Sequence, residues 1–225
     1  MLTLVLTRHG LTPRSLPEQH LGQRIDVELS EAGREQAERL ATRLAGIAFE
    51  RVFSSPLRRA RETAAIVAPD QPAEVDARLL EMDYGEWEGR TYDQIDGTDA
   101  RRRRAWEHDP AVLRCPGGES GNDVAARAAS FLADLLDAHV ARHGAGHEPG
   151  AEETRVLAVA HSSLNRILMC VALGLPIREF RQRFTQGQVN ITVLRFEHGE
   201  GPSDARLLLL NDLEHVRPVG TPPWE

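Results

Sequence analysis

The sequence predicts an α/β fold: a three-layer αβα arrangement around a mostly parallel, mixed sheet, with a largely helical insertion over the pocket. Two runs rich in aliphatic residues, Leu2–Thr7 and Thr154–Ala160, have the length and composition of buried strands. Segments with helical apolar spacing lie between the candidate strands, which is the alternation typical of βαβ units. This alternation stops from about Met82 to about Gly150, so we expect these residues to form the insertion.

The composition indicates a single domain over residues 1–225, with 82–150 as its insertion. The 225 residues are 41% hydrophobic, enough for one sizeable core. The mean hydropathy of -0.38 is typical of a soluble protein. The apolar start Leu2–Leu6 is too short for a signal peptide or a spanning helix, so a cytoplasmic location is expected. A net charge of -7 argues against broad affinity for nucleic acid or membrane, so an anionic ligand must be attracted locally.

Neither cysteines nor histidines predict a metal site. Cys115 and Cys170 show no CxxC spacing, so we expect no disulfide and no thiolate ligands. His139, His143 and His147 recur every four residues, which on a continuous helix suits a metal ion. Two intervening glycines interrupt that helix, and we therefore predict no metal.

The first half of the chain alternates strands and helices. Residues 11–29 contain two prolines and little periodicity, which predicts a long ordered loop near the pocket. Ser30 can cap a helix that ends at Gly46. A short strand, 51–53, leads into a helix opened by Ser54-Ser55-Pro56, and residues 74–76 are a third strand.

The second half contains one long helix and three strands. The long helix starts at Ser120, with Asp123 completing a capping box, after short helical pieces in the insertion. The strand 154–160 is followed by a helix that starts at Ser162 and stops at Gly174. Residues 189–196 and 205–211 are closing strands, and the end 217–225 is expected to be irregular.

Two predicted strands deliver a histidine at their carboxyl ends. The first runs directly into Arg8-His9-Gly10, and Thr154–Ala160 runs into His161. Ligands of open α/β sheets bind outside the carboxyl ends of the strands. We therefore expect both histidines at the floor of one pocket, with Gly10 allowing the backbone to approach the ligand.

Five short motifs follow one another in a shared register. They are Leu6-Thr7-Arg8-His9-Gly10; Gly22 with Asp26 and Leu29; Ser54-Ser55-Pro56-Leu57-Arg58-Arg59-Ala60; Leu80-Glu81 before Tyr84-Gly85; and Ala160-His161-Ser162. From about Leu2 to about Phe196 they resemble the histidine phosphatase superfamily, which contains cofactor-dependent phosphoglycerate mutases and many small phosphatases. Each residue alone has an ordinary structural explanation, but the shared register has none.

The resemblance implies five catalytic residues and no metal or other cofactor. His9 is the nucleophile that becomes phosphorylated, Arg8 and Arg59 bind the phosphoryl group, His161 is a further phosphate contact, and Glu81 is the general acid. The register favours Arg59 over its neighbour Arg58. Arginine forks suit the equatorial oxygens of a transferring phosphoryl group, and surrounding cations favour a neutral His9.

Three further residues are candidate substrate contacts: Ser15, Gly22 and Ser162. The family commonly has an acidic residue after the glycine and an asparagine five residues after it, where this chain has Leu11 and Ser15. The hydroxyl of Ser15 can still donate one hydrogen bond to phosphate. Ser162 stands where glycine is frequent, and its backbone N–H at a helix start remains available to an anion.

Within the family the sequence favours a phosphatase. Residues 82–89 and Pro116-Gly117-Gly118-Glu119-Ser120 resemble the phosphatase branch, including the α-ribazole and glucosyl-3-phosphoglycerate phosphatases, and the insertion is shorter than mutases usually carry. We therefore predict a metal-independent phosphomonoesterase acting on a small phosphorylated metabolite.

Two alternatives remain. A mutase would keep water away from the phosphohistidine. A non-catalytic module that senses phosphorylated ligands would be expected to lack His9, Arg59 or Glu81, all of which are present. The run Arg101–Arg104 either grips a second anionic group or forms a solvated face. Trp87 and Trp106 are expected to pack the insertion. A homodimer is compatible with the sequence, which leaves the oligomeric state open.

Overall fold

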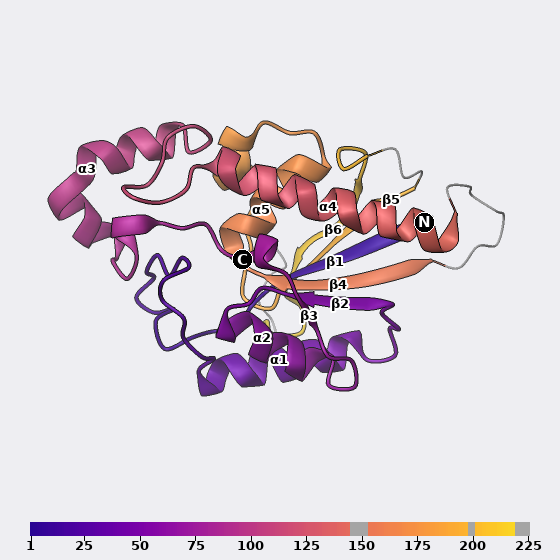
Figure 1. Ribbon diagram of the computed structural model, residues 1–225. Helices are drawn as coiled ribbons and strands as arrows, with labels where there is room; N and C mark the ends of the chain where they lie inside the picture. Colours follow the sequence, from indigo (N-terminus) through magenta and orange to yellow (C-terminus); the bar gives the residue numbers. More distant parts are fainter. Residues whose placement is uncertain (145–152, 198–200, 219–225) are drawn as a thin grey trace.

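A computed structural model describes residues 1–144, 153–197 and 201–218. Their six strands form a sheet in the order β3-β2-β4-β1-β5-β6 (Figure 1). β1, β2, β3 and β4 pair in parallel, whereas β5 and β6 are antiparallel, so the sheet is mixed as predicted. The strands are β1 (Leu2–Arg8), β2 (Arg51–Ser54), β3 (Glu74–Val75), β4 (Thr154–Ala160), β5 (Ile191–Phe196) and β6 (Arg206–Asp212).

Helices cover both faces of the sheet, which confirms the three-layer arrangement. α1 and α2 lie on one side, and α4 and α5 lie on the other (Figure 1). The α-helices are α1 (Glu31–Leu44), α2 (Arg58–Val67), α3 (Tyr92–His108), α4 (Gly121–His143), α5 (Ser162–Ala172) and α6 (Phe180–Arg183), and the 3-10 turns are η1 (Ala77–Leu79), η2 (Gly85–Trp87) and η3 (Ile177–Glu179).

Alternation along the central strand produces two cores. Leu2, Leu4 and Leu6 pack in the core that contains residues of α4 and α5. Val5, between them, packs in the core that contains residues of α1 and α2. Successive side chains of a strand point to opposite faces, so an unbroken apolar run is what a strand covered on both faces requires.

Two predicted helix starts are confirmed by their caps. The Ser30 hydroxyl accepts a hydrogen bond from the Gly33 N–H at 3.1 Å. Ser120 and Asp123 form a capping box at the start of α4. Such caps satisfy N–H groups that have no partner within the helix and each stabilises by about 1 kcal/mol.

Two local expectations need correction, those for Pro56 and Gly10. α2 begins at Arg58 with Leu57 as its N-cap, so Pro56 precedes the helix instead of lying in its first turn. A β-carbon on Gly10 would lie 2.5 Å from the Gly33 carbonyl oxygen, so this glycine permits a close approach to α1 and not to a ligand. A third outcome agrees with expectation: α3 consists of two short helical pieces that meet at a kink at Asp99, where the backbone is not helical.

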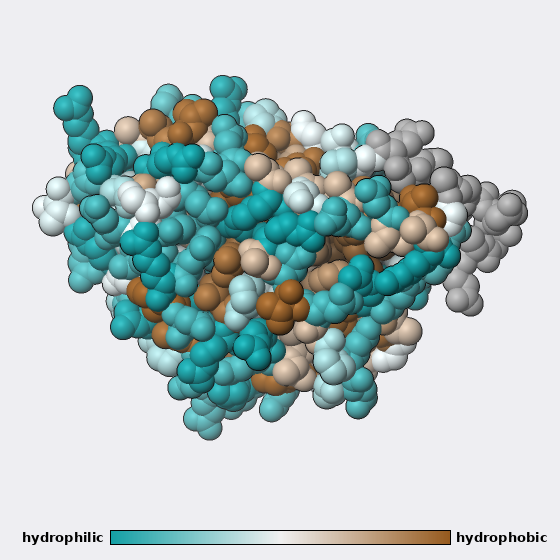
Figure 2. Space-filling view, in the orientation of Figure 1, coloured by the Kyte–Doolittle hydropathy of each residue, from teal (hydrophilic) through white to brown (hydrophobic). Residues whose placement is uncertain are grey.

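The outer surface carries the charge that the composition predicts. The face in Figure 2 is mostly hydrophilic, with apolar residues scattered over it. Among the described residues, no helix is both long and apolar enough to cross a bilayer. Cys115 and Cys170 are buried free thiols, as expected. Trp87 and Trp106 are buried against each other with ring centroids 5.8 Å apart, which confirms their packing role.

Candidate active site

Three parallel strands bring their carboxyl ends to one place. β1 lies beside β4 with Arg8 opposite Ala160, and the backbone N–H of His9 donates to the Ala160 carbonyl at 3.0 Å. His161 follows β4 directly, so the two imidazole rings lie 5.2 Å apart between centroids. The predicted meeting of the two histidines is therefore confirmed.

The hydrogen bond of His9 determines its tautomer. Nδ1 lies 2.8 Å from the Gly10 carbonyl oxygen, which can only accept. Nδ1 therefore carries the proton, and in the neutral ring Nε2 has a free lone pair. The ring is 4% exposed and lines a cavity of about 290 Å³. His9 thus presents an unprotonated nitrogen on a ring held by a strand end.

Two arginines carry positive charge to the same cavity. Arg59 is fully buried and donates to the carbonyls of Gly22 at 2.8 Å and Ile25 at 2.9 Å. Arg8 donates to the Gln186 carbonyl at 2.9 Å. Within the described residues neither guanidinium has a carboxylate within ion-pair distance, and the Nε atoms of both are buried without a hydrogen-bond partner. Carbonyl contacts fix the orientation of the two groups, and the carboxylate of Glu81 acts on both charges from beyond ion-pair distance.

Burial and these charges keep both histidines neutral. Burial lowers the pKa of His9 well below 6.5, and the charges of Arg59 and Arg8 lower this pKa further. Burial also lowers the pKa of His161 well below 6.5, with Arg59 adding to the effect. The neutral state predicted for His9 is confirmed, with burial as a larger cause than the cations.

His161 lies behind the cavity wall. Its Nε2 is 2.8 Å from the Ser55 hydroxyl, while its Nδ1 is buried without a partner. Ser55 follows β2 and donates its backbone N–H to the Val159 carbonyl at 3.1 Å. His161 is completely buried and is not among the residues that line the cavity, so its ring is one layer deeper than His9.

Glu81 lines the cavity and is held at the start of α5. Its Oε1 accepts the N–H groups of Met82 at 2.9 Å and Leu164 at 3.1 Å, and its Oε2 accepts the N–H of Ser163 at 3.2 Å. Oε2 therefore retains a position for a proton or a further donor.

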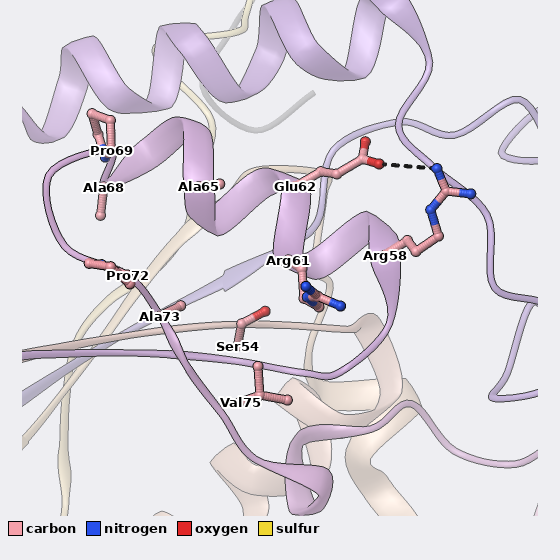
Figure 3. A pocket seen from close by; sticks show the side chains of 10 residues that line it. All are labelled: Ser54, Arg58, Arg61, Glu62, Ala65, Ala68, Pro69, Pro72, Ala73 and Val75. Atoms are coloured by element: carbon pink, nitrogen blue, oxygen red, sulfur yellow. Dashed lines mark ion pairs between the residues drawn. The ribbon is translucent and has the colours of Figure 1, made fainter.

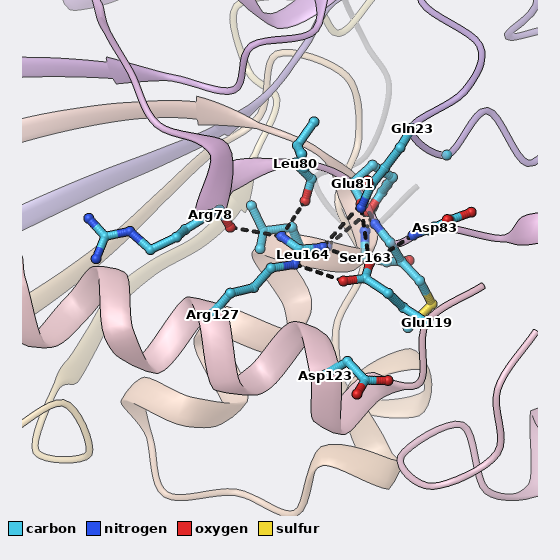
Figure 4. A network of polar contacts seen from close by, with 12 residues as sticks. Gln23, Arg78, Leu80, Glu81, Asp83, Glu119, Asp123, Arg127, Ser163 and Leu164 are labelled. Carbon is cyan, nitrogen blue, oxygen red and sulfur yellow. Dashed lines mark hydrogen bonds and ion pairs between the residues drawn. The ribbon is translucent and has the colours of Figure 1, made fainter.

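Arg127 of α4 holds the backbone that carries Glu81 (Figure 4). Its Nη1 donates to the carbonyls of Arg78 at 2.7 Å and Leu80 at 2.6 Å, and its Nη2 donates to the Glu81 carbonyl at 3.0 Å. Its charge is balanced by Glu119 at 3.1 Å. One side chain thus fixes three carbonyls within residues 78–81, a segment that has no regular secondary structure after Leu79.

Gln23 extends this support from the loop. Its Nε2 donates to the Glu81 carbonyl at 2.8 Å and to the Glu119 carboxylate at 3.1 Å. The N–H of Asp83 donates to the same carboxylate at 2.9 Å. The Pro-Gly-Gly-Glu-Ser segment noted in the sequence therefore supplies a half-buried anchor, Glu119, for the Glu81 segment.

We expect Arg127→Met to lower kcat by about 10- to 100-fold with a smaller change in KM, because displacement of Glu81 by about 1 Å is enough for such a loss. The carbonyls of Arg78 and Leu80 also lose their donor, while that of Glu81 keeps Gln23, so the free energy of unfolding should fall by about 2–3 kcal/mol. Steady-state kinetics and urea unfolding measure both. Arg114→Met is the matched control, because Arg114 is 59% exposed and pairs only with Asp123. Equal losses of kcat in both variants would contradict the positioning role.

The three predicted substrate contacts all line the cavity: Ser15, Gly22 and Ser162. Gly22 has a φ of +53°, and its carbonyl oxygen is the one that accepts from Arg59. The Ser15 hydroxyl accepts from the Thr12 N–H at 2.9 Å. These observations place the residues at the cavity without testing their contact with a substrate.

Sequence reasoning missed a large part of the cavity wall. The residues concerned are Arg14, Leu16, Glu18, Gln19, His20, Leu21, Tyr84, Tyr92, Arg166, Arg181 and Gln188. Arg166 had an available signal, because it lies four residues after Ser162 and so on the same helix face. Arg181 and Tyr92 had none, since helices from distant parts of the chain bring them together.

The arginine run of the insertion does not reach this cavity. None of residues 101–104 lines it. Arg103 pairs with Glu107 at 2.6 Å and with Asp96, and Arg102 lies 3.8 Å from Asp99. The hypothesis that this run grips a substrate anion is therefore wrong for the arrangement described. The charges of Arg102 and Arg103 are engaged along α3.

Arg58 is also directed elsewhere. Its backbone N–H donates to Asp26 at 2.7 Å, and its guanidinium, 53% exposed, pairs with Glu28 at 2.7 Å. It lines a larger cavity of about 550 Å³ beside α2 and β3, where it also faces Glu62 (Figure 3). The choice of Arg59 as the arginine of the histidine cavity agrees with its burial there.

The histidine series in α4 forms no described metal site. His139 and His143 stack at 4.9 Å, and His143 lies 2.7 Å from a Glu50 oxygen. His147 lies outside the described residues. Within the residues that the structure describes, no group of three potential metal ligands occurs.

The neutral buried histidines predict a pH-dependent stability. Burial lowers the pKa of His20 to about 3, and Arg181 and Arg103 lower this pKa further. Like His9 and His161, it then binds a proton only in the unfolded chain just below pH 6.5, so the free energy of unfolding falls as the pH falls. We expect a loss of about 1 kcal/mol per pH unit for each such histidine between pH 6 and 5. Urea unfolding at several pH values measures this slope, which should become shallower in His20→Gln; an unchanged slope would refute the assignment.

Known proteins with this sequence pattern and fold are phosphatases and a probable mutase. The model of the histidine phosphatase superfamily (branch 1) matches residues 4–212. Glucosyl-3-phosphoglycerate phosphatase of Mycobacterium tuberculosis (strain CDC 1551 / Oshkosh) is 37% identical over 193 residues, 85% of this chain and 84% of that protein. The acid phosphatase of Mycobacterium tuberculosis (strain ATCC 25618 / H37Rv) is 33% identical over 218 residues, 96% and 95% of the two chains. A probable phosphoglycerate mutase of Enterobacter sp. (strain 638) is 30% identical over 207 residues, 90% of this chain and 87% of that protein.

A solved structure agrees in fold as well. The complex of mycobacterial glucosyl-3-phosphoglycerate phosphatase with inorganic phosphate aligns with a TM-score of 0.81 at 34% identity, covering 96% of this chain and 99% of that one. The match of the family model, the identities above 30% and the fold agree with the residues gathered around His9. The chain belongs to the histidine phosphatase superfamily, branch 1.

Proposed function

We propose that this protein hydrolyses a small phosphorylated metabolite through a phosphohistidine on Nε2 of His9, without a metal ion. The family and its phosphatase relatives establish the class of reaction, hydrolysis of a phosphate monoester. The observation that carries the proposed route is the bond from His9 Nδ1 to the Gly10 carbonyl at 2.8 Å, which leaves Nε2 unprotonated on a ring that lines the cavity.

In the first step Nε2 of His9 attacks the phosphorus atom and the ester oxygen leaves. Arg8 and Arg59 bind the equatorial oxygens, whose charge would otherwise oppose the attack of a lone pair. Because their guanidinium groups have no carboxylate partner in the described chain, their charge is available to the phosphoryl group. His161, one layer deeper, supports the ring of His9, with the two ring centroids 5.2 Å apart. The phosphate contact expected of His161 is not part of this route, because its ring does not line the cavity.

Glu81 exchanges the protons. Oε2 gives a proton to the departing alkoxide, and the resulting carboxylate then takes a proton from the water that attacks the phosphohistidine. Phosphate leaves, and both His9 and Glu81 return to their initial states. Ser15 and the backbone N–H of Ser162 are proposed to donate to the remaining phosphate oxygens, beside the Gly22 carbonyl that fixes Arg59.

A phosphorus NMR time course tests the proposal. Purified enzyme with a chelator is supplied with 3-phosphoglycerate, 2,3-bisphosphoglycerate, O-phosphoserine and a panel of sugar and nucleoside phosphates. Inorganic phosphate from at least one ester, absent with His9→Ala, is the expected result. Formation of 2-phosphoglycerate with little free phosphate would instead identify a mutase, and activity that is lost with chelator would refute the metal-independent route.

A further inference from the structure

The cavity contains more positive charge than one phosphate group needs. Five arginines line it, and the carboxylates in its wall come from Glu18 and Glu81: the arginines are Arg8, Arg14, Arg59, Arg166 and Arg181. The whole chain has a net charge of -7, so this excess is local. The proposed phosphate site uses Arg8 and Arg59, which leaves three arginines unassigned.

Arg166 points its guanidinium to the start of its own helix. Its Nε donates to the Ser162 carbonyl at 3.1 Å, and its Nη2 lies 3.3 Å from the Ser163 hydroxyl. Its guanidinium carbon lies over the ring of Phe180, 5.4 Å from the ring centroid. In the described chain it forms no ion pair with a carboxylate. Its charge is therefore held in place, with the carboxylate of Glu81 acting on it from beyond ion-pair distance.

Arg181 of α6 approaches the cavity from another side. Its Nη2 donates to the Tyr92 hydroxyl at 3.2 Å, and its guanidinium carbon lies 4.8 Å from the Trp106 ring centroid. The nearest carboxylate oxygen belongs to Glu107 at 3.9 Å, and that oxygen is engaged by Arg103 at 2.6 Å. Arg181 is thus positioned by neutral rings and only weakly neutralised.

A series of contacts leads from Glu81 to Arg181 along the wall. The N–H of Ser163 donates to Glu81, and the Ser163 hydroxyl lies 2.7 Å from the Tyr84 hydroxyl. The ring of His20 is 4.3 Å from that of Tyr84 and 4.9 Å from that of Tyr92. Tyr92 then accepts from Arg181. Arg181 is therefore separated from Glu81 by the rings of Tyr84, His20 and Tyr92, whereas Arg166 lies beside Ser163 at the Glu81 end of this series.

His20 carries a polar atom without a partner at the end of the cavity that Tyr92 and Arg181 line, here called the far end. It is 6% exposed, it lines the cavity, and its Nε2 is buried without a hydrogen-bond partner. Buried polar atoms and buried charges without partners are costly unless a ligand completes them.

We propose that Arg166 and Arg181, with Tyr92 and His20, form a second anion site that binds an anionic group on the alcohol part of the substrate. The substrate is then a phosphate monoester that also carries a carboxylate or a second phosphate. This inference rests on the proposed function for the location of the first phosphate. Binding of a second anionic group, which the sequence had suggested for Arg101–Arg104, is thereby assigned to Arg166 and Arg181.

Burial of Arg166 supports the same conclusion. Burial lowers the pKa of Arg166, and the charge of Arg181 lowers this pKa further. A bound anion would offset both effects. The site is consequently expected to bind an anion more tightly at low ionic strength.

Matched ester pairs test the inference. Phosphate release is measured for 3-phosphoglycerate against glycerol 3-phosphate, and for O-phosphoserine against O-phosphoethanolamine; the members of each pair differ at the carboxylate. Fructose 1,6-bisphosphate against fructose 6-phosphate is the corresponding pair for a second phosphate. Wild-type enzyme should favour the doubly anionic member of at least one pair by about 10-fold or more in kcat/KM.

The variant Arg181→Met should remove most of that preference, with a loss of about 10- to 100-fold for the preferred ester, mainly in KM, and a change within about 3-fold for its partner. Arg181→Lys should restore part of it. Arg183→Met is the control on the same helix, since Arg183 is 53% exposed and pairs with Glu179. A preference that is absent in the wild type, or equal in wild type and Arg181→Met, would overturn the inference.

Binding distinguishes this failure from a failure of the proposed function. Calorimetric titration of wild-type enzyme and Arg181→Met with 3-phosphoglycerate and with fructose 1,6-bisphosphate does not require turnover. Binding of either ligand that depends on Arg181, without release of phosphate from any ester, would support the second anion site and refute the proposed hydrolysis. Hydrolysis of an ester, with no effect of Arg181→Met on either kinetics or binding, would support the proposed function and refute the second anion site.

Discussion

Replacement of His9 by alanine is expected to lower kcat by at least about 10⁴-fold, because the variant has no nitrogen to accept the phosphoryl group. KM should change little, since Arg8 and Arg59 keep their carbonyl partners. Phosphate release gives the rate. Quenching the wild-type reaction in alkali should preserve a phosphohistidine signal in the phosphorus spectrum, and the variant should lack it.

The fold of this variant is checked separately. His9 is 4% exposed, so its removal leaves a small cavity and a destabilisation of about 1–2 kcal/mol. Loss of one buried neutral histidine should also make the pH dependence of unfolding shallower. A folded His9→Ala protein that retains kcat within about 10-fold of the wild type would refute the nucleophile assignment.

Arg59→Met is expected to lower kcat by about 10²- to 10³-fold, as for other single donors aimed at transition-state charge. The expected free energy of unfolding is also lower, by about 2–3 kcal/mol, because the carbonyls of Gly22 and Ile25 lose a charged donor. Arg59→Lys keeps the positive charge but lacks the planar pair of guanidinium donors, so its kcat should lie between those of the wild type and Arg59→Met. Kinetics and urea unfolding measure these effects.

Arg58→Met is the matched control for Arg59. The two residues are adjacent, but Arg58 is 53% exposed and pairs with Glu28 on the surface. We expect its kcat to stay within about 3-fold of the wild type and its stability within about 1 kcal/mol. If Arg58→Met is instead the variant with the larger loss of kcat, the assignment of the phosphate-binding arginine is wrong.

The predicted elements agree with the structure where a local pattern decides them. The strands that end at His9 and His161 are apolar runs, and the helices after Ser30 and Ser120 have their caps. These features depend on neighbouring residues. The kink of α3 at Asp99 has no such signal, and the start of α2 at Arg58 differs from the position that the proline favoured. Tertiary packing decided both.

The sequence by itself determined the reacting end of the cavity. Arg8, His9 and His161 follow two strands directly, and neighbouring parallel strands must bring their carboxyl ends to the same edge. Arg59 and Glu81 were identified by motifs that stand in a shared register with these histidines along the sequence. Five residues could therefore be chosen before any contact was known.

Only the tertiary structure decided the far end. His20 comes from a loop, Tyr92 from the insertion and Arg181 from a four-residue helix, and no spacing in the sequence relates them. In the run 101–104, Arg103 pairs with Glu107 one turn further along α3. The contacts that position Arg181 come instead from Tyr92 and Trp106, which are distant in the sequence, so only packing could show which charge faces the cavity.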